Sequence, residues 1–367
     1  MHISAPGKLF LSGEWAVLEL GNPGLVTAVD KRVHVEIEDS DEIIFNIDEA
    51  NIKDVKAEFD GNELKLQEGL DEKAIDYLKF MKASIEATFK YLSEIKTFKI
   101  KSWGDLSQVT IDGEVKKVGF GSSAASVVAT VGALLKFFGH DIEDYETRKK
   151  IYKLSAIVHY FAQGKVGSAF DVAASTFGGV FIYQRFDPKW LIEKMESGAS
   201  VKDIVDQEWP SLQLEPLEIP EGFRLLVGWT KESASTSAMV KQLNEWAKTN
   251  QEDYKRLYDA IADTVKELIP NWKEKNKEEI LRLLKKNEDI LRELGQKSGV
   301  NIETPDLKKL SDLANENGGA GKLSGAGGGD CGIAICFDDE TAKKITDSWK
   351  NAEFYVVDTT IDYNGVK

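Results

Sequence analysis

Val118-Gly119-Phe120-Gly121-Ser122-Ser123-Ala124-Ala125 is a loop of small residues that leads directly into an apolar helical pattern. Glycine lets the backbone approach a phosphate closely, and the start of a helix adds partial positive charge. The pattern predicts a buried helix that begins at Ser122 or Ser123 and runs to about Phe138, with Gly139 as its stop. We interpret the loop as a phosphate site, although the two hydroxyls are also typical helix caps.

Two further glycine-rich loops flank this one at a distance. Pro6-Gly7-Lys8 opens an apolar strand, and Ser324-Gly325-Ala326-Gly327-Gly328-Gly329 precedes another. The Walker pattern is absent, because each Gly-Lys pair is followed by Leu or Val. Gly119 to Ala124 fits a dinucleotide fingerprint loosely, but no strand ending in an acid follows about 20 residues later, so a Rossmann dehydrogenase is disfavoured.

Composition restricts the classes of partner. The 367 residues contain 47 basic and 62 acidic side chains, a net charge of −15. We therefore expect no nucleic-acid partner and no membrane association. There is no apolar run long enough for a membrane span and no signal core. Cys331 and Cys336 are expected on opposite faces of one strand, so we predict no disulfide, no zinc site and a cytoplasmic location.

Hydrophobic periodicity predicts the remaining elements. The first 37 residues indicate strand, turn and strand, and residues 72–95 and 143–162 indicate helices. We place a domain change in the mixed segment 187–220. Beyond it we predict the following elements: a strand at 223–229, helices at 236–248, 251–269 and 277–297, a strand at 331–337, a helix at 339–350 and a strand at 354–360.

The three loops, in this order and at these separations, resemble the three motifs of the GHMP kinase superfamily. The first motif matches residues 4–14, the second residues 118–125 and the third residues 322–331, so the resemblance frames almost the whole chain. It implies an α+β fold with two domains. The N-terminal domain, 1–186, would be rich in βαβ units with a left-handed crossover, and 187–220 would connect it to a ferredoxin-like C-terminal domain, 221–367.

Within the superfamily, the chain most resembles the phosphomevalonate kinases, on residues 163–174, on 234–237 with 239–240, and on 329–333. Mevalonate kinases usually have a histidine where this chain has Trp15. The resemblance implies transfer of the γ-phosphoryl group of ATP to 5-phosphomevalonate in the mevalonate route to isoprenoids, with Mg²⁺ as cofactor. The alternatives are a mevalonate kinase, another small-molecule kinase of the superfamily, or an inactive nucleotide or metabolite sensor. The oligomer is expected to be a monomer or homodimer.

The same resemblance assigns roles to residues. Lys8 and Asp171 match the family's catalytic pair, and Ser123 matches a Mg²⁺ ligand. The residues implied in nucleotide binding are Gly119, Gly121, Ser122, Ser123, Ala124, Lys101 and Trp103. The substrate needs cations and hydroxyls for its carboxylate and phosphate. The candidates are Lys165, Ser168, Arg185, Ser235, Ser237, Lys241 and Gly327.

Phosphate chemistry refines the catalytic pair. A phosphate monoester is largely dianionic at neutral pH, because its second pKa is about 6. An acceptor of this kind needs no strong base, and an unscreened Asp171 would repel it. We therefore predict a Lys8–Asp171 ion pair in which the carboxylate orients the lysine. His159 stands where mevalonate kinases place a metal-ligating glutamate, which leaves the second metal ligand open. Asp330 is expected to fix the third loop.

Overall fold

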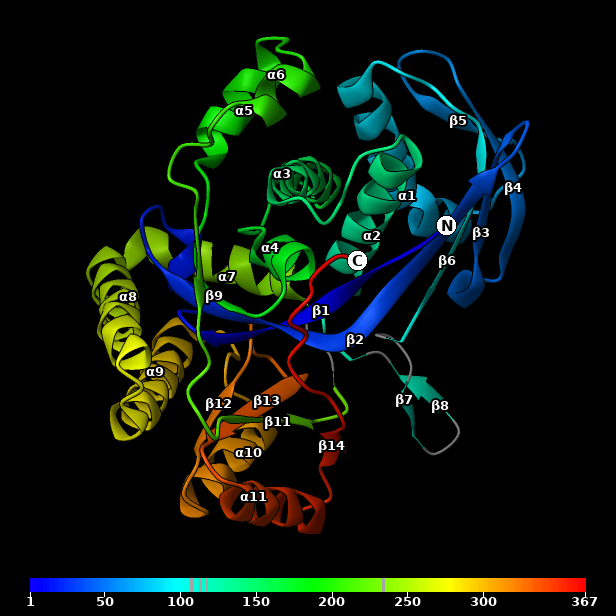
Figure 1. Cartoon of the computed structure of the whole chain (residues 1–367). Coiled ribbons are helices and arrows are strands. Elements are labelled where there is room, and N and C mark those ends of the chain that lie inside the picture. The colour runs from blue at the N-terminus through cyan, green and yellow to red at the C-terminus, as the bar shows by residue number, and fades with distance from the viewer. Residues whose placement is uncertain (106–108, 112–113, 117, 233–234) are drawn as a thin grey trace.

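The computed structural model describes residues 1–105, 109–111, 114–116, 118–232 and 235–367. Eight of the described strands form one sheet, drawn in Figure 1, in the order β10-β9-β2-β6-β3-β4-β5, with β1 paired to β2. The strands are β1 (His2–Ser12), β2 (Gly24–Asp39), β3 (Ile43–Ile47), β4 (Ile52–Phe59), β5 (Leu64–Leu66), β6 (Phe98–Gly104), β9 (Val180–Gln184) and β10 (Gln213–Leu217). The short pair β7 (Val109–Ile111) and β8 (Glu114–Lys116) forms a separate hairpin.

Helices cover one face of this sheet (Figure 1). They are α1 (Glu72–Leu92), α2 (Ser122–Phe137), α3 (Tyr145–Ala162) and α4 (Phe170–Phe177). Helix α2 packs on β1 and β2 and lies between α1 and α3. It is apolar nearly all round, and most of its residues are buried, as the sequence predicts. It begins at Ser122, and Gly139, at a φ of 90°, follows its end.

The C-terminal lobe has a second, antiparallel sheet in the order β12-β13-β11-β14. Its strands are β11 (Arg224–Trp229), β12 (Ala320–Leu323), β13 (Cys331–Cys336) and β14 (Tyr355–Val357), and α10 (Pro305–Glu316) and α11 (Asp339–Asn351) pack against it. This is the βαββαβ order of a ferredoxin-like fold. Three further helices, α7 (Thr236–Thr249), α8 (Gln251–Lys273) and α9 (Lys277–Ser298), are inserted after β11. The α+β, two-domain prediction is confirmed.

Two chain segments depart from the expected division. The segment expected as a connection, 187–220, folds as helices α5 (Pro188–Glu196) and α6 (Val201–Asp206) and strand β10, which pairs with β9 in the first sheet. The C-terminal tail also returns to the N-terminal lobe, where Lys367 and Ser4 exchange backbone hydrogen bonds and Asp362 pairs with Arg32. Pairing between distant segments is not visible in local sequence patterns. Neither the pairing of β10 with β9 nor the contact of the C-terminal tail with the N-terminal lobe was therefore predicted.

Helix α10 and strand β12 were not predicted either. Thr304 caps α10 with a side-chain hydrogen bond, Pro305 occupies its first turn, and Leu307 and Leu310 bury its inner face. The signals for a start and an apolar stripe are present, but the helix is short and directly precedes the glycine-rich loop. Residues 318–329 were interpreted as a single loop, whereas their first part pairs with β13.

A buried polar network joins the two lobes behind the first motif. Glu14 and Lys322 form an ion pair that solvent does not reach. Asn287 on α9 accepts hydrogen bonds from Ser12 Oγ and Gly13 N, at 3.0 and 3.2 Å, and donates to Glu14. Because each polar atom named here has a partner, this contact holds the first motif against the C-terminal lobe.

Candidate active site

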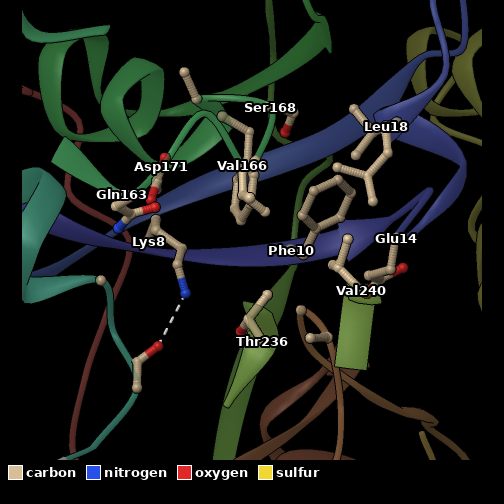
Figure 2. A pocket seen from close by; sticks show the side chains of 18 of the residues that line it. Lys8, Phe10, Glu14, Leu18, Gln163, Val166, Ser168, Asp171, Thr236 and Val240 are labelled. Atoms are coloured by element: carbon tan, nitrogen blue, oxygen red, sulfur yellow. Dashed lines mark hydrogen bonds between the residues drawn. The ribbon is translucent and has the colours of Figure 1, made fainter. Parts of the chain in front are cut away.

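A cavity of about 340 Å³ opens between the lobes, and all three glycine-rich loops line it (Figure 2). Lys8 comes from β1, Gly119, Gly121 and Ser123 come from the second loop and α2, and residues 324–327 come from the third loop. The segment 166–171 before and within α4 adds a fourth wall. The convergence expected from sequence is thus realised in one cavity.

The second loop is fixed by its glycines. Gly121, at a φ of 78°, precedes α2, and that helix has no side-chain cap. The first N–H groups of a helix have no intrahelical acceptor, so those of residues 122–124 remain available to an anion. The backbone N–H of Gly119 donates to Asp330 Oδ1 at 2.9 Å. A Cβ at position 119 would lie 1.4 Å from Asp330 Oδ2, so glycine is required there.

Asp330 therefore ties the third loop to the second, a wider role than the one expected from sequence. It lies at the cavity and is largely buried, and this burial raises the pKa of its carboxyl above its usual value. The Gly119 N–H and the nearby Lys8 charge act against that shift by favouring the carboxylate.

Lys8 reaches into the cavity beside this loop. Its Nζ donates a hydrogen bond to the carbonyl oxygen of Gly119 at 2.9 Å, the dashed line in Figure 2, and lies 5.7 Å from the centre of the Phe170 ring. The methylene chain packs over Gly121, where an added Cβ would come within 3.1 Å of Lys8 Cε. Two of the three ammonium hydrogens remain for a ligand.

The predicted ion pair between Lys8 and Asp171 is absent from the described residues, so that prediction is wrong for this structure. The carboxylate lies in the first turn of α4, where Asp171 Oδ1 accepts from Val172 N at 3.0 Å. Its other oxygen lies 3.9 Å from His159 Nδ1. The Lys8 ammonium instead donates to the Gly119 carbonyl, because this carbonyl lies where the Lys8 side chain of β1 reaches the second loop.

His159 and Ser123 form the wall next to Asp171. His159 is buried on α3, its Nε2 lies 3.1 Å from Ser123 Oγ and 2.8 Å from Gln163 Nε2, and its ring stacks on Phe80. Ser123 therefore does not cap its helix, the alternative that the sequence left open.

The described cavity lining offers only a few protein groups that could hold a metal ion. Among the described residues, there is no group of three or more His, Cys, Asp or Glu side chains placed to hold a metal ion. Mg²⁺ commonly takes one or two protein oxygens together with substrate phosphates and water. The Ser123 hydroxyl and the Asp171 carboxylate both line the cavity beside the second glycine-rich loop, and this donor set fits such an ion.

The structure separates the predicted substrate residues into two groups. Ser168 and Gly327 line the cavity, and Gly327 has a φ of 80°. The others are absent from the described lining: Lys165, Arg185, Ser235, Ser237 and Lys241. Lys165 is exposed and lies 3.8 Å from Glu196, and Ser235 caps α7. Arg185 is buried behind the cavity wall.

The two residues predicted at the nucleotide from β6 also lie outside the cavity lining. Lys101 pairs with Asp48 at 3.0 Å, and Trp103 stacks against the rings of His2 and His34. Sequence reasoning missed other lining residues: Phe10, Trp15, Val17, Leu18, Tyr160, Gln163, Val166, Thr236 and Val240. Several of them lie within or next to the quoted motifs, so position in or near a motif was the available signal.

Comparison with known proteins decides the family. Residues 79–179 match the model for the GHMP kinases N terminal domain, and residues 265–356 match the model for GHMP kinases C terminal. A phosphomevalonate kinase of Streptomyces sp. is 31% identical over 348 residues, which cover 93% of this chain and 91% of that protein. The chain belongs to the GHMP kinase family.

Solved structures agree with the fold of this GHMP kinase. A Listeria innocua protein, Lin0012, is 32% identical with a TM-score of 0.89, covering 100% of this chain and 98% of its own. A Streptococcus pneumoniae phosphomevalonate kinase in complex with phosphomevalonate and AMPPNP is 24% identical with a TM-score of 0.81, covering 99% and 100%. No helix in the described part of the chain is long and apolar enough to cross a membrane.

Proposed function

We propose that this GHMP kinase is a phosphomevalonate kinase, which converts ATP and 5-phosphomevalonate into ADP and 5-diphosphomevalonate. The observation that carries the proposal is the meeting of three glycine-rich loops with Lys8 in one cavity between the lobes. The 31% identity to the Streptomyces enzyme, along nearly the whole of both chains, supports the choice of acceptor.

The second loop would bind the ATP phosphates. The N–H groups of Ser122, Ser123 and Ala124 start α2, and Gly119 and Gly121 let the backbone approach the anion. Ser123 Oγ would hold Mg²⁺, which when bound neutralises charge on the phosphate oxygens. We retain Lys101 and Trp103 as proposed nucleotide contacts, although reaching the cavity would require β6 side chains to leave their present partners.

Lys8 would stabilise the transfer itself. An oxygen of the acceptor phosphate forms a bond to the γ-phosphorus, the bond to the β,γ-bridging oxygen breaks, and ADP leaves with that electron pair. No proton has to be removed from a dianionic acceptor. The Lys8 ammonium, positioned by the Gly119 carbonyl, can contact both anions and offset their repulsion.

Asp171 would act as a positioning group rather than as a strong base. Its carboxylate is held at the start of α4 and faces His159 rather than Lys8. We propose Ser168 and Gly327 as acceptor contacts in the cavity. Lys165, Arg185, Ser235 and Ser237 would act from outside its present lining. A cytoplasmic location and a monomer or homodimer complete the proposal.

A coupled assay of ADP release tests the function. The purified enzyme with Mg²⁺-ATP is offered phosphomevalonate, mevalonate, homoserine and galactose in separate reactions, and phosphorus NMR identifies the product. We expect turnover with phosphomevalonate and a new diphosphate signal, with the Lys8→Met variant as the inactive control. Faster turnover of mevalonate would replace the proposal, and nucleotide binding without ADP release from any acceptor would favour a sensor.

A further inference from the structure

Two hydrogen-bond donors at the cavity wall have no partner. Trp15 Nε1 and Ser168 Oγ are buried atoms without a hydrogen bond, and their residues are only 4% and 3% exposed. Both residues line the cavity. An unpaired buried polar group is costly, so native structures seldom retain one without a ligand or a water to satisfy it. Both groups can donate, so a fitting ligand presents an acceptor.

Arg185 links the two chain segments that carry these donors. Its Nη1 donates to the carbonyl of Leu18 at 2.6 Å, and its Nη2 donates to the carbonyl of Gly167 at 3.0 Å. One guanidinium therefore joins the short helix η1 (Ala16–Leu18), which follows Trp15, to the loop that contains Ser168. Tyr183 also donates a hydrogen bond to the Ser168 carbonyl.

Arg185 also leaves positive charge behind this wall. Its side chain is buried, its Nε has no hydrogen-bond partner, and within the described residues it forms no ion pair. A buried cation without a counter-ion favours an anionic group nearby. The lone donors and the uncompensated charge thus point to the same ligand chemistry, which is an anion that accepts two hydrogen bonds.

The Leu18 end of the cavity lies apart from Lys8 and Asp171. Figure 2 shows Lys8, Gln163 and Asp171 on one side of Phe10, and Leu18, Glu14 and Val240 on the other. Glu14 on that side is already paired with Lys322, so it leaves no free negative charge to satisfy Arg185. The remaining wall there is largely apolar, from Val17, Leu18 and Val240, whereas Val166 lies on the Lys8 side of Phe10.

The backbone at Trp15 supports a functional placement. Trp15 has a φ of 66° and a ψ of −55°, a conformation unfavourable for a residue with a side chain. Hydrogen bonds on both sides hold it, from Val17 N to Gly13 O at 3.1 Å and from Leu18 N to Trp15 O at 2.9 Å. The backbone of Trp15, a residue that lines the cavity, is thereby fixed.

We infer that Trp15 Nε1–H and Ser168 Oγ–H bind the carboxylate of the acceptor, with Arg185 as a positioning residue behind them. The inference rests on the proposed function and specifies which end of the acceptor lies where. The phosphate faces Lys8, the carbon chain crosses the apolar wall, and the carboxylate ends at the two donors.

A cycle of enzyme and substrate variants tests this. The acceptors are phosphomevalonate and its neutral carboxamide, and the enzymes are wild type, Trp15→Phe and Ser168→Ala. For wild type we expect the carboxamide to bind about 10- to 100-fold more weakly in calorimetry, as for loss of hydrogen bonds to a charged group. Each variant should raise KM for phosphomevalonate about tenfold with little change in kcat, and should reduce the preference for the carboxylate.

Matched variants separate binding from packing. Ser155 is also buried with an unpartnered hydroxyl but lies outside the cavity lining, so Ser155→Ala should leave KM unchanged. Arg185→Lys should keep part of the carboxylate preference and Arg185→Gln should lose it. If Trp15→Phe does not fold, Ser168→Ala and the two acceptors still decide the question.

Two results would overturn the inference: a wild-type enzyme that does not distinguish carboxylate from carboxamide, or variants that keep the full preference. Failure of the proposed function would give a different result, namely turnover of another acceptor. If wild type turns over another acceptor instead of phosphomevalonate, the same cycle applies to an acceptor with a carboxylate. An acceptor that lacks any carboxylate would refute the inference as well.

Discussion

Lys8 and Lys322 are two lysines from the first and third motifs, and their surroundings are opposite. Lys322 is fully buried, pairs with Glu14, and donates to the Leu323 carbonyl at 2.6 Å. Lys8 is half-buried at the cavity, donates to the Gly119 carbonyl, and makes no ion pair with Asp171. One lysine has its charge neutralised within the protein, whereas the other keeps its charge for a ligand.

The difference teaches how one fold separates stability from catalysis. A buried pair with its hydrogen bonds satisfied contributes specificity of packing, and breaking it leaves a desolvated charge. A lysine held by a neutral carbonyl forms no ion pair within the described residues, which suits a site where anionic groups meet. The predictions below test this division, from the largest expected effect to the smallest.

Lys8→Met should abolish most of the activity while leaving the fold intact. We expect kcat to fall by about 10³-fold or more, because the cation next to the transferred group is removed. Steady-state ADP release measures the loss, and the denaturant midpoint should stay near that of wild type. A variant that lost stability but kept its kcat would show that Lys8 stabilises the fold and does not act in catalysis.

Lys322→Met should instead lower the stability of the fold. It leaves Glu14 buried without its partner, so we expect the free energy of unfolding to fall by about 3–5 kcal/mol. Chemical denaturation gives the value. The double variant Glu14→Gln with Lys322→Met removes both charges and should recover part of the loss, and no recovery would show that packing rather than charge is responsible.

Asp171→Asn should reduce kcat by about 10- to 100-fold, less than Lys8→Met, since we assign the carboxylate a positioning role. The asparagine keeps an oxygen for the Val172 N–H but loses the charge facing His159. Comparing the pH–rate profiles of the two variants checks this. If Asp171→Asn costs more than Lys8→Met and removes a basic limb from the profile, the carboxylate acts as a general base.

The buried network around Lys322 should make stability depend on pH through Glu288. Burial raises the pKa of this carboxyl to about 8, above its ordinary value of 4.5, although Lys322 and the Leu323 N–H act against the shift. Between these values the folded state holds a proton that the unfolded state has released. Stability should therefore fall as pH rises from about 4.5 to 8, by on the order of 1 kcal/mol per pH unit.

Denaturation of wild type and Glu288→Gln across that range isolates the contribution. The difference between the two free energies of unfolding should change with pH in the direction just given, because glutamine does not titrate. A difference that is constant with pH would mean that Glu288 ionises normally, with its charge satisfied by Ser311 and by the Leu323 N–H, which both carboxylate oxygens share.

Sequence patterns predicted most of the helices, and the resemblance to the GHMP kinases implied the two-domain α+β architecture. The amphipathic stripes of α1, α8 and α9 and the apolar helix α2 carry their periodicity locally, so their ends were predicted within a few residues. Strand β10, strand β12 and the returning tail depend on partners far along the chain, and local patterns contain no information about which strands pair.

The features of the candidate site can be separated in the same way, into those encoded locally and those that depend on distant segments. By itself the sequence determined the glycine-rich loop before α2, the lysine of the first motif and the family, because glycine spacing and a helix start are encoded over a few residues. Only the tertiary structure decided that Lys8 bonds to Gly119 rather than to Asp171, that Arg185 lies behind the wall, and that Trp15 lines the cavity with its indole N–H unpartnered. Charge pairing and burial depend on distances between segments remote in sequence, which form only when the lobes pack together.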